Sequence, residues 1–291
     1  MIEKIILGTV QLGLDYGINN PHGKPSLEEA FKILEAAFDN GIRTLDTAEA
    51  YGNSQEIIGK FQNEFPNKKF QIISKLASNA EITPENFITH VAHNCKVLNS
   101  DQLFGYMFHN YPSFKARVGL YDKLVLAKKE GLVSKAGISL YGNNEIEDIL
   151  NNYDGFDFIQ IPFNLFDNDS KRSVFLKEAK RKGIEVHTRS VFLQGLFFKP
   201  KSKILATLKP LITHLDTLES IKNATSINTQ TLALQYVLQK KYIDRVLIGV
   251  ETAKQLVDNI NSCKDEQAIP HHLIDAIDVK EIELLNPSNW S

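Results

Sequence analysis

Short apolar runs alternate with longer amphipathic runs along the whole chain of 291 residues. The apolar runs are rich in Ile, Leu, Val and Phe, which is typical of parallel strands that are covered on both faces. We therefore predict strands over residues 5–10, 44–46, 70–76, 103–109, 135–139, 156–162, 185–190 and 246–249.

The amphipathic runs between these strands predict helices. In residues 26–39, Leu27, Phe31 and Leu34 recur near helical spacing, and Ser26 is a suitable N-cap. Similar runs predict helices over residues 54–65, 84–98 (capped by Thr83), 118–130, 145–152, 170–181 and 252–261, with one or two helices in 204–239 and one tail helix in 271–285. Residues 11–25 and 191–203 are expected to be loops.

Eight strand–helix units in strict alternation predict an α/β fold, and a closed (β/α)8 TIM barrel with a C-terminal helical tail fits them best. An open dinucleotide-binding sheet is disfavoured, because no Gly-x-Gly-x-x-Gly follows the first strand. No low-complexity linker interrupts the pattern, so we expect residues 1–291 to form one domain.

Charge and cysteine content narrow the class of protein. The formal net charge of −2 gives no reason to expect a nucleic-acid or anionic-membrane partner. The two cysteines, Cys95 and Cys263, lie far apart, so we expect no metal site and a reducing, cytoplasmic compartment. Glu3 and Lys4 interrupt the short apolar N-terminus, which does not fit a signal peptide, and no segment is long enough to cross a membrane.

Four polar residues stand at the ends of consecutive predicted strands. Asp46 and Tyr51 follow the second strand, Lys75 lies near the end of the third, and His109 ends the fourth. Catalytic groups of such barrels lie at the carboxyl ends of the strands. Lys75 has apolar neighbours, so its ammonium needs a carboxylate partner, and Asp46 on the neighbouring strand is available.

A lysine ammonium beside a tyrosine stabilises the phenolate, so we expect Lys75 to lower the pKa of Tyr51 from about 10. A tyrosine tuned in this way can protonate an oxygen that gains negative charge, and His109 can orient that oxygen. Each residue also has a structural alternative when taken singly. Lys75 would then be a surface lysine, Asp46 a loop-fixing residue and His109 a core histidine.

The residues at these strand ends resemble the aldo-keto reductase family. The resemblance extends over nearly the whole chain and its motifs are specific in combination. It is carried by Leu45-Asp-Thr-Ala-x-x-Tyr-Gly52, Ile73-Ser-Lys75, Phe108-His-Asn110, Gly137-Ile-Ser139, Phe158-Ile-Gln160, Arg189-Ser-x-x-x-Gln-Gly-Leu196 and Leu247-Ile-Gly-Val250 with Gln255 and Asn259.

This resemblance implies an NAD(P)H-dependent reductase of a small-molecule aldehyde or ketone, with Tyr51 as general acid, Lys75 and Asp46 as its tuning pair, and His109 orienting the carbonyl. It also implies cofactor contacts along the strand ends. Ser139 and Gln160 would hold the nicotinamide carboxamide, Arg189 would take the place of a stacking aromatic, Ser190, Leu193 and Gly195 would lie along the pyrophosphate, and Gly249, Lys254, Gln255 and Asn259 would face the adenosine.

The chain departs from the family pattern where many members bind the 2′-phosphate of NADPH. Gly249 and Val250 replace a lysine–serine pair, Gln255 replaces an arginine, and Glu251 adds an acid. NADPH is the family default, and Lys254 is the cation nearest in sequence for the phosphate. We therefore expect only about a tenfold preference for NADPH, with NADH also accepted.

Two other classes of function stay open at this point. Potassium-channel β subunits resemble reductases yet act largely as regulatory partners, and the short sequence before the first strand disfavours that reading. A lyase or isomerase would use Lys75 as a Schiff-base amine.

The loop Gly8–Gly17 resembles a bacterial subgroup tied to sugar metabolism. The aromatic candidates for the substrate pocket are Tyr111, Phe114, Phe163, Phe166, Phe192 and Trp290.

Overall fold

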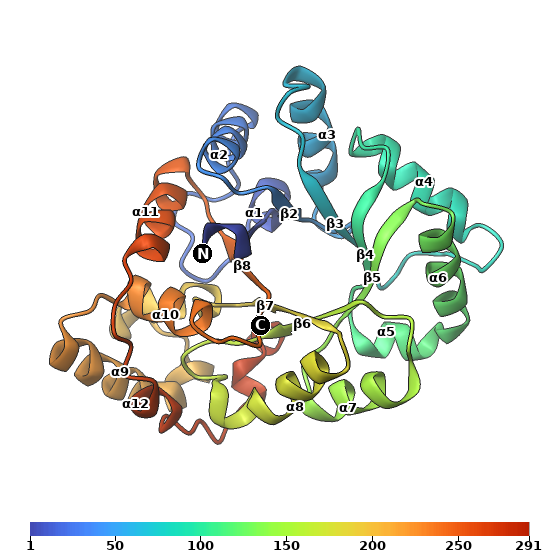
Figure 1. The fold of residues 1–291 in the computed structure, drawn as a ribbon. Coiled ribbons are helices and arrows are strands. Elements are labelled where there is room, and N and C mark those ends of the chain that lie inside the picture. Colours follow the sequence, from blue (N-terminus) through green and yellow to red (C-terminus); the bar gives the residue numbers. More distant parts are fainter. Residues whose placement is uncertain (291) are drawn as a thin grey trace.

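The computed structural model describes residues 1–290, which fold around a closed barrel of eight parallel strands (Figure 1). Each strand pairs with the next in the sequence, and β1 closes the ring against β8, where Gly8 lies beside Gly249. The strands are β1 (Ile5–Gly8), β2 (Thr44–Asp46), β3 (Gln71–Leu76), β4 (Leu103–Phe108), β5 (Val133–Ser139), β6 (Phe158–Pro162), β7 (Glu185–Arg189) and β8 (Arg245–Gly249). The predicted (β/α)8 fold is confirmed.

Helices surround the barrel as an outer ring (Figure 1). Apolar side chains between the strands and this ring form one continuous core. The helices are α1 (Val10–Gly13), α2 (Leu27–Asp39), α3 (Ser54–Glu64), α4 (Phe87–Val97), α5 (Tyr111–Ala116), α6 (Tyr121–Lys129), α7 (Asn143–Asn152), α8 (Asp169–Arg181), α9 (Ile212–Thr225), α10 (Thr229–Leu238), α11 (Ala253–Lys264) and α12 (His271–Asp275). No helix among the described residues has the length and apolar character that crossing a membrane requires.

Several predicted boundaries are wrong near the loops. The first strand ends at Gly8, and Val10, which was expected to end that strand, begins the short helix α1, which continues into the segment expected to be a loop. Helix α4 begins at Phe87 with Asn86 as its N-cap, because Asn86 accepts a hydrogen bond from the backbone of Thr83 and draws residues 83–86 into a turn. Ser26 does cap α2, by accepting from the Glu29 amide.

The C-terminal tail is not the single helix that its sequence predicts. Helix α12 stops at Asp275, and only short 3-10 turns follow, at Ile282–Leu285 and Pro287–Asn289. The tail is held by tertiary contacts, since the Asn168 side chain donates hydrogen bonds to the carbonyls of Ile274 (2.8 Å) and Ile277 (2.9 Å). These bonds satisfy backbone groups that a continuous helix would have used internally.

The inside of the barrel is filled by its own side chains. Ile6, Ile73, Met107 and Phe158 form a separate buried cluster there. Residue 137 must be glycine, because a Cβ at this position would lie 2.2 Å from the Phe158 ring. The middle of the barrel is therefore a packed core, and space for a site is left at the carboxyl ends of its strands.

Candidate active site

The polar residues at the strand ends lie one inward-facing position above this apolar layer. Side chains two positions apart on a strand point to the same face. Ile73, Met107 and Phe158 fill the barrel, so Lys75, His109 and Gln160 point into the space above them. Likewise, His187 stacks on Phe158 at a centroid distance of 4.5 Å, and Arg189 lies two positions further on.

Lys75 and Asp46 form a buried ion pair at the floor of this space, and each side chain is only 2% exposed. Lys75 also donates to the carbonyl of Thr47 (3.0 Å), and Gln160 donates to the second carboxylate oxygen of Asp46 (2.8 Å). Burial alone would lower the pKa of Lys75, but the attraction of Asp46 outweighs it and the pKa is raised. The pairing thus favours the ammonium form of Lys75, which disfavours its use as a Schiff-base nucleophile.

The Tyr51 hydroxyl lies 3.3 Å from Nζ of Lys75, which also sits 4.8 Å from the centre of the Tyr51 ring. Burial raises the pKa of Tyr51 above its ordinary value, and the nearby Lys75 charge opposes that rise. The expected net lowering of this pKa is thus wrong, although Lys75 acts in the expected direction. Tyr51 stays protonated, as a proton donor must be.

His109 faces Tyr51 edge-on, with ring centroids 5.9 Å apart. Burial, reinforced by the Lys75 charge, lowers the pKa of His109 from 6.5 to about 4. Its Nδ1 atom is buried and has no hydrogen-bond partner among residues 1–290. The ring is therefore neutral near pH 7 and can donate one hydrogen bond to a substrate oxygen without adding a charge.

The loop that carries Tyr51 is held against α1 by contact between the two backbones. A Cβ at position 13 would lie 1.7 Å from the carbonyl oxygen of Tyr51, so only glycine allows this approach. Ser54 adds hydrogen bonds to the hydroxyls of Thr9 (2.8 Å) and Thr47 (3.1 Å). These contacts join the ends of β1 and β2 and determine where the phenol lies.

A second anchor of the same loop is the carboxylate of Glu49, which sequence analysis missed. It accepts hydrogen bonds from the Tyr106 hydroxyl, from Nε2 of His90 (2.8 Å), from Nδ2 of Asn94 (3.0 Å) and from the amide of Ala77 (3.0 Å). The loop between Asp46 and Tyr51 is thereby tied to the end of β3, to β4 and to α4.

These groups open into a cavity of about 920 Å³ at the carboxyl ends of the strands. Twelve of the fourteen predicted site residues line it, namely Asp46, Tyr51, Lys75, His109, Ser139, Gln160, Arg189, Ser190, Gly195, Gly249, Gln255 and Asn259. Two do not. Leu193 is fully buried in the apolar core, and Lys254 is 84% exposed and bonded to Asp258. The C-terminal tail closes one side through Asn286 and Ser288.

Comparison with known proteins decides the family. The model of the aldo/keto reductase family matches residues 4–280. The chain belongs to the aldo/keto reductase family.

Relatives and solved structures agree with this assignment. A putative aryl-alcohol dehydrogenase of Schizosaccharomyces pombe is 40% identical over 83 residues, which are 25% of this chain and 22% of the relative. The uncharacterized oxidoreductase YqkF of Bacillus subtilis is 24% identical over 90% of this chain and 87% of its own. An aldo-keto reductase of Bacillus halodurans in a holo form shares the fold with a TM-score of 0.75 and 17% identity, over 96% of this chain and 94% of that chain. The matched stretch thus spans only about a fifth of the first of these relatives.

Within this aldo/keto reductase, the segment after β7 has a strained backbone. Ser190, Leu193, Gln194 and Gly195 all have positive φ, between 46° and 85°. The backbone amides of residues 191 and 192 donate no hydrogen bond within residues 1–290. Left-handed residues that interrupt right-handed ones leave amides pointing into a concave surface, which suits an anion.

The roof of the cavity differs from the aromatic pocket that the sequence suggests. Among the expected wall aromatics, Phe192 lines the cavity, whereas Phe114, Phe163 and Phe166 are fully buried core residues. The indole of Trp290 donates to the carbonyl of Leu284, and the hydroxyl of Tyr111 donates to Asp148.

Tyr16, Asn110, Tyr141 and Gln194 line the cavity in place of those aromatics. The amide of Gln194 donates to the Tyr16 hydroxyl at 2.7 Å and so joins the loops after β1 and β7. Tyr141 and Asn110 follow strand ends closely, so their position was a usable signal. No local pattern marks the pairing of Tyr16 with Gln194, which are 178 residues apart.

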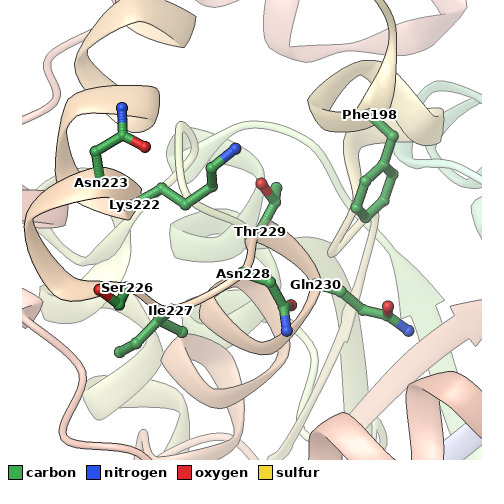
Figure 2. A pocket seen from close by; sticks show the side chains of 8 residues that line it. All are labelled: Phe198, Lys222, Asn223, Ser226, Ile227, Asn228, Thr229 and Gln230. Carbon is green, nitrogen blue, oxygen red and sulfur yellow. The ribbon is translucent and has the colours of Figure 1, made fainter.

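A second, smaller cavity of about 520 Å³ adjoins the first at the junction of α9 and α10. Figure 2 shows Lys222 reaching from α9 toward Thr229, whereas Gln230 points away from it. Phe198 and Gln230 line both cavities. Tyr51, Lys75 and His109 line the larger cavity instead.

Proposed function

We propose that this aldo/keto reductase reduces an aldehyde or ketone to an alcohol, with Tyr51 as the general acid. The observation that carries the proposal is the Tyr51 hydroxyl 3.3 Å from a buried, Asp46-paired Lys75 at the floor of a large cavity. As the carbonyl oxygen gains negative charge, Tyr51 donates its proton to it, and the adjacent ammonium stabilises the phenolate that is left. Neutral His109 donates a hydrogen bond to the same oxygen.

The residues present fit a nicotinamide dinucleotide, which supplies the hydride when bound. Ser139 is 4% exposed, and its hydroxyl makes no hydrogen bond within residues 1–290, so it is available for the carboxamide. Gln160 lines the same part of the cavity. The concave segment around Ser190 would hold the pyrophosphate, and Asn259 would face the adenine.

We further propose a sugar or sugar derivative as the carbonyl substrate. Tyr16, Asn110 and Tyr141 bring neutral hydrogen-bonding groups to the cavity. Such groups favour a substrate with hydroxyl groups over a purely apolar one, because they can form hydrogen bonds with those hydroxyls. We also propose that the protein functions in the reducing cytoplasm.

The test is a panel of sugar, aliphatic and aromatic carbonyls, assayed by cofactor absorbance for wild type, Tyr51→Phe and the matched control Tyr111→Phe. Tyr111 lies outside the cavity, so its variant should keep wild-type turnover. Loss of the general acid in Tyr51→Phe should lower kcat by about two to four decades with cofactor affinity unchanged. Equal turnover by both variants would contradict the role of Tyr51.

Cofactor binding without turnover of any carbonyl would instead support a regulatory partner protein of the channel β-subunit type. Absence of cofactor binding would contradict the proposed function altogether.

A further inference from the structure

The cavity has a second polar end. Its assignment as the adenosine site rests on the proposed function. We call it the acidic end and define it by Glu251, Gln255, Asp258 and Asn259, from the loop after β8 and from α11. Asn259 is only 5% exposed, and its Oδ1 accepts a hydrogen bond from Gln230 (2.6 Å). NADPH differs from NADH by a 2′-phosphate on the adenosine ribose, so residues at this end decide between the two cofactors.

The cation that the sequence offers for that phosphate is already paired. Nζ of Lys254 lies 2.6 Å from the carboxylate of Asp258, one helical turn away on α11. Lys254 is 84% exposed and does not line the cavity, whereas Asp258 does. The pair therefore presents its carboxylate, rather than its ammonium, to the cavity.

Three amides around the start of α11 are also occupied. The Glu251 amide donates to Oε1 of Gln255 (2.8 Å), the Ala253 amide to Glu29 (3.3 Å) and the Gln255 amide to the Thr252 hydroxyl (3.2 Å). A helix N-terminus normally offers free amides to a phosphate. Here the chain's own side chains accept the hydrogen bonds of three of those amides.

The balance of charge at this end is negative. Glu251 and Asp258 line this end, and Glu29 accepts a hydrogen bond from the Ala253 amide beside it, whereas the ammonium of Lys254 lies outside the cavity. Among the described residues that line the cavity, the lysine and arginine are Lys75 and Arg189, on β3 and β7 at the catalytic end. A phosphate dianion at this end would meet the carboxylates of Glu251 and Asp258, and no lysine or arginine among the described residues lines the cavity there, so its approach is repulsive.

Ribose hydroxyls need the opposite kind of partner. Oε2 of Glu251 accepts from Gln255 (3.2 Å), which orients the carboxylate, and Oε1 accepts no hydrogen bond within residues 1–290. A carboxylate is a pure acceptor and suits a hydroxyl donor. We propose that the acidic end selects NADH over NADPH, with Glu251 accepting a hydrogen bond from the adenosine ribose. This reverses the modest NADPH preference expected from the sequence.

The test is calorimetric titration of the intact protein with NADH and with NADPH, at low and at high salt. We expect NADH to bind at least tenfold more tightly, which is about 1.4 kcal/mol. High salt should narrow the gap, because it screens the repulsion between the phosphate and the carboxylates. If a lysine held the phosphate, NADPH would instead lose affinity relative to NADH as salt rises.

Variants locate the source of the selectivity. Asp258→Asn removes a carboxylate and releases Lys254, so the affinity for NADPH should rise several-fold relative to the affinity for NADH. Glu251→Gln should also improve NADPH binding, and it should weaken NADH a few-fold. The matched control is Glu147→Gln, an exposed residue of α7 that does not line the cavity, and it should change neither affinity.

Lys222 is the other cation that could bind the phosphate, because it lines the adjoining smaller cavity (Figure 2). It pairs with Glu219 at 2.8 Å, so Lys222→Ala should leave both affinities unchanged. Tighter binding of NADPH in wild type, lost in Lys222→Ala or Lys254→Ala, would overturn the inference and leave the proposed reductase intact. Failure to bind either cofactor would overturn the proposed function instead.

Discussion

The two ends of the cavity use the same chemical groups in opposite ways. At the catalytic end, the Lys75–Asp46 pair is 2% exposed on both sides and touches the phenol of Tyr51. At the acidic end, the Lys254–Asp258 pair is 84% and 46% exposed. Both are lysine–aspartate pairs, but only the first is removed from water.

Burial decides what each pair can do. A buried charge acts strongly on its neighbours, because solvent does not screen it, and it cannot lose its partner cheaply. An exposed pair contributes about 0–1 kcal/mol to stability. The catalytic pair can therefore tune a proton donor, whereas the exposed pair acts mainly by leaving a carboxylate on the cavity wall.

The same substitution at each end should give the largest contrast. Lys75→Met leaves Asp46 buried and unpaired, so we expect it to lower the free energy of unfolding by about 3–5 kcal/mol and to abolish reduction. Lys254→Met should cost less than about 1 kcal/mol. Urea unfolding of both variants measures the difference, and Lys75→Met/Asp46→Asn should recover part of the loss. Equal stability of the two single variants would show that burial does not separate the pairs.

The anchor of the catalytic loop should give the next largest effect. Glu49→Gln leaves fewer acceptor sites for the donors of Tyr106, Asn94 and Ala77, and should lower stability by about 1–3 kcal/mol. Because the Tyr51 loop loosens, kcat should fall while cofactor affinity stays constant. Tyr106→Phe removes one donor and should cost less. A Glu49→Gln protein with wild-type kcat would limit Glu49 to a stabilising role.

The stability of the protein should depend on pH through His109 at the catalytic end of the cavity. His109 has its pKa lowered from 6.5 to about 4 by burial, so the folded protein excludes a proton that the unfolded chain binds. Its contribution is complete above pH 6.5 and is lost as the pH falls toward 4. The pKa of this ring is also affected by the charges of Asp46, Lys75, Glu49 and Arg189. These four residues are present both in the wild type and in a protein with His109 substituted.

Urea unfolding at pH 7 and pH 5 checks this prediction. His109→Gln should reduce the loss of stability on acidification, whereas His93→Gln, at an exposed site on α4, should not. The same loss in wild type and His109→Gln would assign the pH dependence to other groups.

The smallest effect is expected from Lys254→Ala. Because its ammonium is exposed and paired outside the cavity, its removal should change the affinity for either cofactor by less than about threefold. Calorimetric titration beside Asp258→Asn makes the comparison direct. A tenfold loss of NADPH affinity would restore Lys254 as the reader of the phosphate.

Local sequence pattern determined much of this protein. The strands follow from short apolar runs, because both faces of these strands are buried, and most helices follow from burial that repeats about every 3.6 residues. Tyr51, Lys75 and His109 were predictable as a set, since parallel strands bring their carboxyl ends to one edge. The same register places Ser139, Gln160 and Arg189 beside them.

Only the tertiary structure decided the rest. Helix α12 ends early, and Asn168, more than 100 residues away in the sequence, binds the carbonyls of Ile274 within it and of Ile277 just after it. The net pKa of Tyr51 depends on burial, and the adopted direction of the Lys254 side chain depends on its bond to Asp258. The four donors to Glu49 come from β4, from α4 and from Ala77, just after the end of β3. Loop contacts and charge burial have no sequence period, so they are settled only when distant segments pack against one another.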